Sequence, residues 1–268
     1  MLNIKLNMKA ALLLTLLLSL AVPVQAGNGL IKYADVKESG KYVRKHFVER
    51  LNKPFDETSS KKKAILIGDS HAQDFLNMVI EANRLDNFQI STVHIITQCQ
   101  PYLGDELNQF IKTKDRANCE KGFSIAKSID RIKQADLVIL AANWKEWSIK
   151  QLPTTIKNLA LSDQQHLLIV GRKNLGKVNI RHFLRMSEEE RIAHRNKVDK
   201  KQVSFNQLMQ ETLKERKWID VHSDVCGSSS AQDCPVFTPS GELISFDGGH
   251  LTPAGAKFYG QKLQIPSL

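Results

Sequence analysis

A serine, an aspartate and a histidine stand where they could carry out nucleophilic catalysis. Ser70 ends the stretch AILIGDS, in which four apolar residues run into Gly-Asp-Ser, and a segment with helical spacing follows. A serine at a helix start has backbone amides nearby that can stabilise an oxyanion, but its hydroxyl needs a base. His250 is a candidate base, and Asp247 is placed to orient its ring. These residues predict attack of Ser70 on an acyl group.

The residues around Ser70 have a second interpretation. Ser and Asp are favoured N-cap residues, so Ser70 could cap a helix that begins near Ala72, and the two roles are compatible. His71 would point away from Ser70 at a helix start, which predicts a structural or substrate-binding role for it. Asp69 is adjacent to Ser70 in the chain, too close to it to orient His250, and is expected to bond to nearby loop amides.

Asn143 is a candidate second donor to the oxyanion. It follows the most apolar predicted strand, in the stretch ADLVILAANW, and its side-chain amide could act together with the N–H of Ser70. The alternative is an asparagine that completes a strand-to-helix turn. Trp144 and Trp147 come next; they are either core or rim residues, or rings on which a sugar can stack.

Five short apolar runs of strand length would position these residues, namely 64–67, 89–96, 136–141, 166–170 and 218–221. Segments with helical periodicity alternate with them: 72–85, 116–134, 153–161, 187–217 and a last helix capped by Thr252-Pro253. This alternation predicts an α/β fold, a three-layer α/β/α sandwich with an open, mostly parallel five-stranded sheet. The functional site of such a sheet lies at the carboxyl ends of its strands.

The first 26 residues are predicted to be a signal peptide. Lys5 and Lys9 precede the apolar run 10–22, and Val24-Gln25-Ala26 places small residues at the cleavage positions. The run is shorter than a comfortable bilayer span, with a retained anchor as the alternative, and no other stretch could cross a membrane. We therefore expect a periplasmic or secreted protein with an N-terminal helical lead-in, 27–60, and one enzyme-sized domain, 61–268.

The charge pattern argues against nucleic acid as a partner. The chain of 268 residues has a formal net charge of +10, which falls to +8 without Lys5 and Lys9. Its basic residues are scattered over predicted helices, with no basic stripe and no interleaved aromatics. The most basic segment, 171–185, is expected to be a solvated loop, with an anionic substrate surface as the alternative. We expect a monomer.

Four cysteines in a chain predicted to be exported indicate disulfides. Of the three possible pairings, the local ones, Cys99 with Cys119 and Cys226 with Cys234, are favoured. A zinc site is the competing interpretation, but there is no CxxC spacing, and no histidine is expected near enough to either pair to complete a ligand set. Neither a metal nor another cofactor is predicted.

The combination of these motifs resembles the SGNH, or GDSL-type, hydrolase superfamily. The block Gly68-Asp69-Ser70-His71, the ending DGGHLTPAGAKFYG and three of the cysteines (Cys99, Cys226 and Cys234) resemble more closely the exported SGNH domains fused to membrane acyltransferases that modify bacterial surface polysaccharides. The resemblance covers most of residues 60–263 and implies a flavodoxin-like SGNH fold.

The resemblance also implies roles for single residues. Ser70 would be the nucleophile, His250 the general base and Asp247 its partner, with Ser70 N–H and Asn143 as oxyanion donors. Gly104, after Cys99-Gln100-Pro101, is a candidate for the family glycine. The usual G-x-N-D block around the asparagine is here Ala141-Ala142-Asn143-Trp144.

Three functions follow from these expectations. Because no membrane acyltransferase segment is expected, the simplest is an exported esterase that removes O-acyl groups, above all O-acetyl, from a carbohydrate or cell-envelope polysaccharide. The second is an O-acetyltransferase that passes the acyl group from Ser70 to a glycan hydroxyl, with a separate membrane acyltransferase as partner. The third is a non-catalytic glycan-binding protein, against which the intact Ser, His and Asp set argues.

Overall fold

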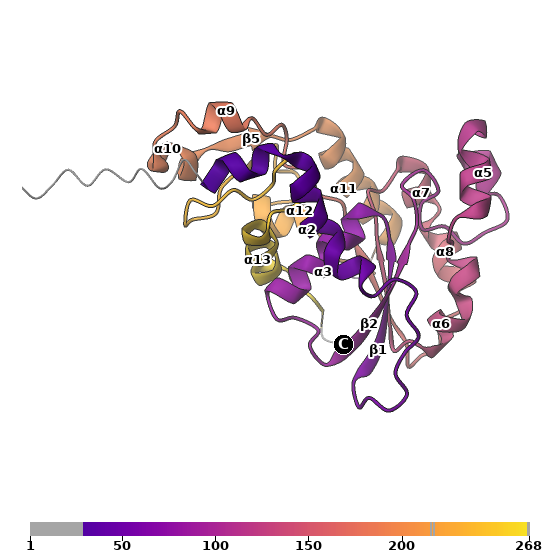
Figure 1. Ribbon diagram of the computed structural model, residues 1–268. Coiled ribbons are helices and arrows are strands. Elements are labelled where there is room, and N and C mark those ends of the chain that lie inside the picture. Colours follow the sequence, from indigo (N-terminus) through magenta and orange to yellow (C-terminus); the bar gives the residue numbers. More distant parts are fainter. Residues whose placement is uncertain (1–28, 215, 217, 267–268) are drawn as a thin grey trace, which may run out of the picture.

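The computed structural model describes residues 29–214, 216 and 218–266 (Figure 1). The predicted signal peptide lies outside the described residues. Among the helices that are described, none combines the length and the apolar character that crossing a bilayer requires.

Four parallel strands form the central sheet: β1 (Lys62–Gly68), β2 (Phe88–His94), β3 (Leu137–Ala141) and β4 (His166–Val170). Their order is β2-β1-β3-β4. The register pairs Gly68 with His94 on one side and with Ala141 on the other, so the strands end at one edge. That edge carries the residues after β1 and β3.

The prediction of a fifth strand at 218–221 is wrong. Ile219 forms a single parallel bridge with Val170. Asp220 then accepts a hydrogen bond from Ser223 N–H as the N-cap of α12 (Val221–Cys226), and the chain turns into a helix. The described sheet therefore has four strands, with a single-residue bridge at each edge, Ile219 beside β4 and Leu51 beside β2. The predicted parallel α/β architecture is confirmed.

Helices cover both faces of the sheet. The face that contains Leu66 and Ile139 packs against a layer that includes α2 (Val36–Val48), α3 (Ser70–Glu81) and α13 (Pro253–Lys262). Side chains alternate across a strand. Ile65 and Leu140 therefore face the other layer, which includes α6 (Ile129–Gln134), α7 (Glu146–Lys150), α8 (Leu152–Leu159) and α11 (Lys200–Leu213).

The remaining described elements are short. They are η1 (Lys32–Ala34), α4 (Leu107–Phe110), α5 (Thr113–Lys121), η2 (Ala126–Ser128), α9 (Ile180–Phe183), α10 (Glu188–Ala193), β5 (Arg195–Lys197) and β6 (Asp233–Pro235). The long helix predicted over 187–217 is wrong, because β5 interrupts it by pairing antiparallel with β6. The helix predicted over 116–134 is likewise divided between α5 and α6.

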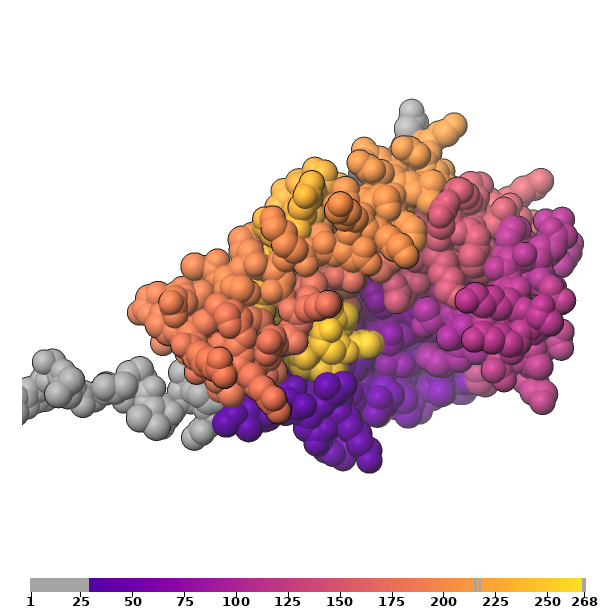
Figure 2. All heavy atoms as spheres, turned by 90° about the horizontal axis from the view of Figure 1, so that it is seen from above, coloured from indigo at the N-terminus to yellow at the C-terminus, as the bar shows by residue number. Residues whose placement is uncertain are grey.

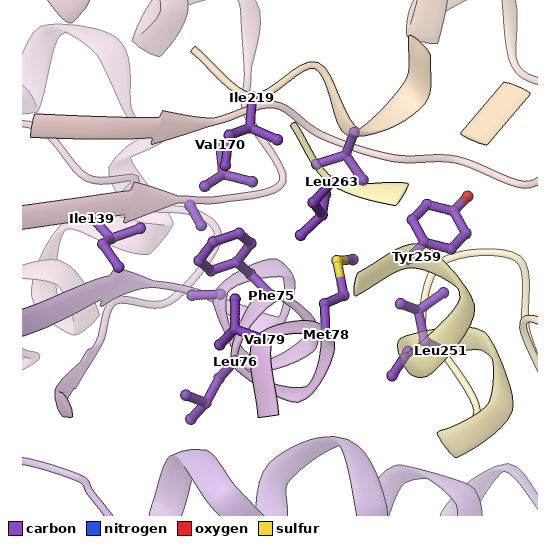
Figure 3. Close-up of a cluster of buried hydrophobic side chains, with 14 of the residues drawn as sticks. Phe75, Leu76, Met78, Val79, Ile139, Val170, Ile219, Leu251, Tyr259 and Leu263 are labelled. Atoms are coloured by element: carbon purple, nitrogen blue, oxygen red, sulfur yellow. The ribbon is translucent and has the colours of Figure 1, made fainter. Parts of the chain in front are cut away.

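The core beneath α3 fixes that helix on the sheet. Phe75, Leu76, Met78 and Val79 of α3 lie among Ile139 and Val170 of the sheet, Tyr259 of α13 and other apolar residues (Figure 3). These α3 side chains are at most 2% exposed. Full burial of one such side chain contributes roughly 1.5–3 kcal/mol. The start of α3, where Ser70 lies, is therefore held rigidly at the carboxyl edge.

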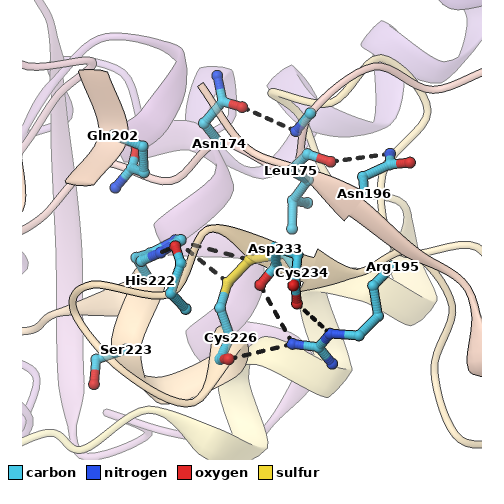
Figure 4. The surroundings of a disulfide bond; sticks show 12 residues. Asn174, Leu175, Arg195, Asn196, Gln202, His222, Ser223, Cys226, Asp233 and Cys234 are labelled. Carbon is cyan, nitrogen blue, oxygen red and sulfur yellow. Dashed lines mark hydrogen bonds and ion pairs between the residues drawn. A yellow bond between two sulfur atoms is a disulfide. The ribbon is translucent and has the colours of Figure 1, made fainter. Parts of the chain in front are cut away.

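Both predicted disulfides are present, Cys99–Cys119 and Cys226–Cys234. The second joins α12 to β6 (Figure 4). The expectation that no histidine lies near a cysteine pair is wrong: His222 is one turn before Cys226, and its Nδ1 lies 3.3 Å from Cys226 Sγ. His222 Nε2 lies 2.8 Å from the carbonyl oxygen of Ala231, to which it donates. The cysteines are bonded to each other, so this cluster is a structural crosslink.

Candidate functional site

Asp69, and not Ser70, caps helix α3. Asp69 has extended backbone angles, and its Oδ1 accepts a hydrogen bond from His71 N–H at 2.9 Å. Ser70 is the first residue of the helix, two residues before the predicted start, so the interpretation of Ser70 as the N-cap is wrong. Its hydroxyl takes no part in closing the helix end.

Asp69 also connects the end of β1 to the residues after β3. Its two carboxylate oxygens accept hydrogen bonds from Asn143 N–H at 3.0 and 3.1 Å. Gly68 makes this approach possible, since a Cβ at that position would lie 1.7 Å from the carbonyl oxygen of Ala141. Asn143 is thereby fixed beside Ser70, and Asp69 bonds to loop amides as the sequence predicted.

Gln100 holds Asn143 from the other side, a role that the sequence analysis missed. Its Nε2 donates to the carbonyl oxygen of Asn143 at 3.2 Å, and its Oε1 accepts from Lys145 N–H at 3.0 Å. Gln100 is buried, follows the disulfide cysteine Cys99 and has a positive φ of 55°. Nothing in its local sequence pattern marks this role, because Asn143 and Lys145 are more than 40 residues away in the sequence. The main chain of Asn143 is held at both its N–H and its carbonyl, which leaves the side-chain amide for a ligand.

The segment 245–251, which we call the histidine loop, holds Asp247 and His250 as a pair. His250 Nδ1 lies 2.7 Å from Asp247 Oδ2. Asp247 Oδ1 accepts hydrogen bonds from the N–H groups of Gly249 and His250 at 2.8 and 2.7 Å. With Nδ1 donating to the carboxylate, Nε2 is the nitrogen that can accept a proton.

Two further residues, Ser245 and Phe246, keep the histidine loop in shape. Ser245 Oγ accepts from Gly248 N–H at 2.8 Å and donates to the carbonyl oxygen of His250 at 2.6 Å. Phe246 packs its ring almost parallel to the imidazole of His250, with the centroids 6.0 Å apart. The loop is therefore ordered by its own hydrogen bonds.

The electrostatics keep Asp247 ionised. Burial by itself raises the pKa of this carboxyl, but the hydrogen bonds and charge of His250 and the N–H of Gly249 outweigh it and lower the pKa to about 2. The carboxylate is then charged throughout the pH range in which an imidazole titrates. It can hold His250 in one tautomer and stabilise an imidazolium.

The histidine loop meets α3 on the face that bears Ser70. Leu251 N–H donates to Asp74 Oδ1 at 3.1 Å. Asp74 lies four residues after Ser70, and helical side chains at this spacing share a face. Lys173, from the segment after β4, pairs with Asp74 at 2.6 Å and also donates to the carbonyl oxygen of Gly249. The structure thus brings the serine-bearing helix and the Asp–His pair together at the carboxyl edge of the sheet.

The segment 171–185 is not simply a solvated loop. Lys173 is 3% exposed, and Arg172 stacks its guanidinium over the ring of Phe205, 4.8 Å from the centroid. The partner that allows Lys173 to be buried, Asp74, is 99 residues away in the sequence. Such a pairing has no local signal, which explains why the predicted solvated loop is wrong for these residues.

The three remaining candidate residues, Trp144, His71 and Gly104, are held by contacts within the protein. Trp144 is 1% exposed and its Nε1 donates to Val170 O at 2.7 Å, so the prediction that it offers a sugar-stacking surface is wrong. His71 is 8% exposed; burial and the charges of Lys173, Arg172 and His250 hold the pKa of His71 well below its usual range, which favours the structural role. Gly104 is tied to α8, because Thr155 and Asn158 bond to the neighbouring Leu103.

Two hollows flank the histidine loop. One is an open groove of about 640 Å³, lined by Asn174, Gly176, Lys177, Asn196, Lys197, Val198, Asp199, Asp247, Gly248 and Gly249. The other, of about 240 Å³, is lined on one side by Phe246, Leu251, Thr252 and Pro253. Figure 2 shows the yellow C-terminal segment reaching the surface between the orange region and the indigo N-terminal helices. Six of the ten residues that line the groove are polar or charged, which suits a ligand rich in hydroxyl groups.

Comparison with known proteins identifies the family of this chain. Residues 41–264 match the family described as SGNH domain (fused to AT3 domains), and the chain belongs to this family. It is therefore an enzyme of the SGNH hydrolase or O-acyltransferase class, which confirms the resemblance drawn from the sequence.

A solved structure shares the fold. It is the periplasmic domain of the lipopolysaccharide acetyltransferase of Salmonella ser. Paratyphi A, with a TM-score of 0.57 and 15% sequence identity, over 88% of this chain and 97% of that one. No curated protein matches the sequence.

Proposed function

We propose that this protein is a carbohydrate O-acyltransferase, acting above all on O-acetyl groups, that forms an acyl-enzyme on Ser70. The observation that supports it most is the hydrogen-bonded Asp247–His250 pair in a loop that contacts α3 one turn from Ser70. Membership in a family described as fused to AT3 domains favours transfer over hydrolysis. The sequence alone favours the esterase over the transferase, and the family description reverses that order.

The mechanism uses each group in turn. Ser70 Oγ attacks the acyl carbonyl while His250 Nε2 takes its proton, and Asp247 stabilises the imidazolium. The N–H of Ser70 and the side-chain amide of Asn143 bind the oxyanion. The donor's leaving group departs with the proton from His250. A glycan hydroxyl then gives its proton to His250 and attacks the acyl-serine, which releases the acylated glycan and restores Ser70.

The partners follow from the same proposal. The acceptor is a cell-envelope polysaccharide that lies in the groove beside Asp247, and a membrane acyltransferase supplies the acyl group. The family description and the periplasmic acetyltransferase domain of similar fold support both partners and a place on the outer side of the inner membrane.

An esterase is the second candidate. The side chains of His250 and Asp247 are 31% and 29% exposed, so water can reach the pair. Water that attacks the acyl-serine in place of a sugar hydroxyl would complete a hydrolysis with the same residues. The two functions differ in how well the acceptor competes with water.

The test is a product analysis with acetyl-labelled p-nitrophenyl acetate, with and without an oligosaccharide acceptor. We expect acetylated oligosaccharide to exceed free acetate at saturating acceptor, whereas acetate alone in both reactions would indicate the esterase. Replacing Ser70→Ala should abolish both products without lowering Tm, and the exposed Ser60→Ala should leave both unchanged. No product from the wild type, together with no labelling of Ser70 by a serine-directed phosphonate, would exclude both enzymes and leave glycan binding.

A further inference from the structure

We propose that Asp74 and Lys173 are positioning residues that hold His250 against Ser70. The proposal rests on the function proposed above and concerns the contact between the histidine loop and α3. It assigns a task to a buried ion pair that touches neither the substrate nor the reacting atoms.

Asp74 and Lys173 form hydrogen bonds with the residues on both sides of His250 in the chain. Asp74 Oδ1 accepts from Leu251 N–H at 3.1 Å, and Lys173 Nζ donates to the carbonyl oxygen of Gly249. Asp74 Oδ2 and Lys173 Nζ are 2.6 Å apart, with side chains 0% and 3% exposed. One residue on either side of His250 is thus joined to the helix that begins at Ser70.

The other hydrogen bonds of the histidine loop do not make this connection. Those of Ser245 and Asp247 lie within the loop and shape the Asp–His pair. The bond from Leu175 N–H to Gly248 O, at 2.8 Å, joins the loop to the segment after β4. In the part of the chain that the structure describes, the hydrogen bonds from this loop toward α3 run through Asp74 and Lys173.

The buried ion pair of Asp74 and Lys173 is expected to contribute more to the position of His250 than to the stability of the fold. A buried ion pair can often be replaced by apolar residues of similar size at little or no loss of stability, because both charges must be desolvated. Removal of only one partner leaves an uncompensated charge and strongly destabilises. A double apolar replacement therefore separates the positioning of His250 from the stability of the fold.

The experiment compares the wild type with the double variant Asp74→Leu/Lys173→Met. The rate at which a fluorophosphonate labels Ser70, and kcat and KM for p-nitrophenyl acetate, are measured beside Tm. We expect labelling and kcat to fall about 100-fold, the scale of a small misplacement of catalytic groups, with KM within about twofold. The downfield NMR signal of His250 Nδ1–H should persist, because the Asp247 contact lies within the loop.

The matched control is an exposed ion pair of the same length. Lys150 and Glu146 are also 2.6 Å apart, but their side chains are 57% and 61% exposed. The variant Glu146→Gln/Lys150→Met should label and turn over at the wild-type rate. If the double Asp74→Leu/Lys173→Met variant does not fold, Asp74→Asn/Lys173→Met tests the same contact, since it removes both charges, keeps an acceptor for Leu251 N–H and loses the donor to Gly249 O. We expect about 10-fold slower labelling.

The outcomes separate this proposal from the function on which it rests. A wild-type enzyme that is not labelled at Ser70 would overturn the proposed function. A wild type that is labelled, with a folded Asp74/Lys173 variant labelled at the same rate, would leave the function standing and overturn the positioning role. Equal labelling of wild type and a folded Asp74→Asn/Lys173→Met variant would do the same.

Discussion

The two sides of the candidate site are built in different ways. On one side, Asn143 lies where it does because β3 is paired with β1, and Asp69 and Gln100 bond to its main chain. On the other side, His250 comes from a loop outside the sheet, and its approach to α3 depends on the buried pair of Asp74 and Lys173. The first side is set by strand register and the second by a few specific contacts. Substitutions that disturb how each side is held should therefore act on stability at the first side and on alignment at the second.

The largest expected effect is that of Asp247→Asn on the loop side. The asparagine keeps an oxygen to accept from the N–H groups of Gly249 and His250, but it presents an NH₂ group to Nδ1. The imidazole then carries its proton on Nε2 and cannot take one from Ser70. We expect kcat/KM to fall about 10⁴-fold with the fold intact. Steady-state kinetics beside Tm check this, and a loss below tenfold would argue against His250 as the base.

Next in size is Asn143→Ala on the sheet side. The hydrogen bonds that fix residue 143 involve its main chain and survive the change, so only the side-chain amide is lost. We expect kcat to fall about 10²–10³-fold with little change in KM. A rise in KM with unchanged kcat, measured on the same ester, would instead assign Asn143 to substrate binding.

Two glycines test the contrast between the sides directly. A Cβ at Gly68 would lie 1.7 Å from the main-chain oxygen of Ala141 in β3, which the sheet holds in place. A Cβ at Gly248, which has a φ of +88°, would lie 1.8 Å from Gly176 O, in a segment outside the sheet. We expect Gly68→Ala to cost about 3 kcal/mol of unfolding free energy, and Gly248→Ala about 1 kcal/mol together with a larger loss of kcat. Urea unfolding and ester kinetics of both variants test this difference. Equal losses of unfolding free energy would show that the two sides of the site are not held in different ways.

The smallest effect is the pH dependence that Asp247 adds to stability. Its pKa is about 2 in the folded protein and about 3.9 in an unfolded chain, so its contribution is complete above pH 4 and is lost as pH falls toward 2. Because the carboxylate is partly exposed, we expect about 1 kcal/mol. Urea unfolding of wild type and Asp247→Asn from pH 6 to pH 2 should show the difference shrinking with acid. A difference that stays constant would contradict the lowered pKa.

The sequence predicts well what depends on near neighbours. Thr252-Pro253 marks the start of α13, and Thr252 Oγ1 accepts from Gly255 N–H at 3.0 Å as an N-cap should. The run 166–170 is β4, because strand periodicity and flanking polar residues agree there. The D-x-x-H spacing predicts the Asp247–His250 contact, since three residues suffice to form it.

Features that depend on residues far away in the chain could not be predicted from the sequence. Lys173 belongs to a basic segment and is buried only because Asp74 lies opposite. Ser187 and Glu190 form a capping box at the start of α10, but the pairing of β5 with β6 ends the helix predicted over 187–217 early. Trp144 follows a strand end, where exposure is common, and the bond to Val170 O holds it in the core.

The capping of α3 by Asp69 makes Ser70 a residue that can be exchanged without disturbing its surroundings. The Ser70→Ala variant would keep the groove, the oxyanion donors and the base, and lack only the atom that starts the reaction. It would thus be a capture reagent: immobilised and exposed to envelope extracts, it should retain the acyl donor or glycan that the active enzyme would convert and release. The identity of the natural substrate then becomes a question for mass spectrometry of what the inactive protein holds.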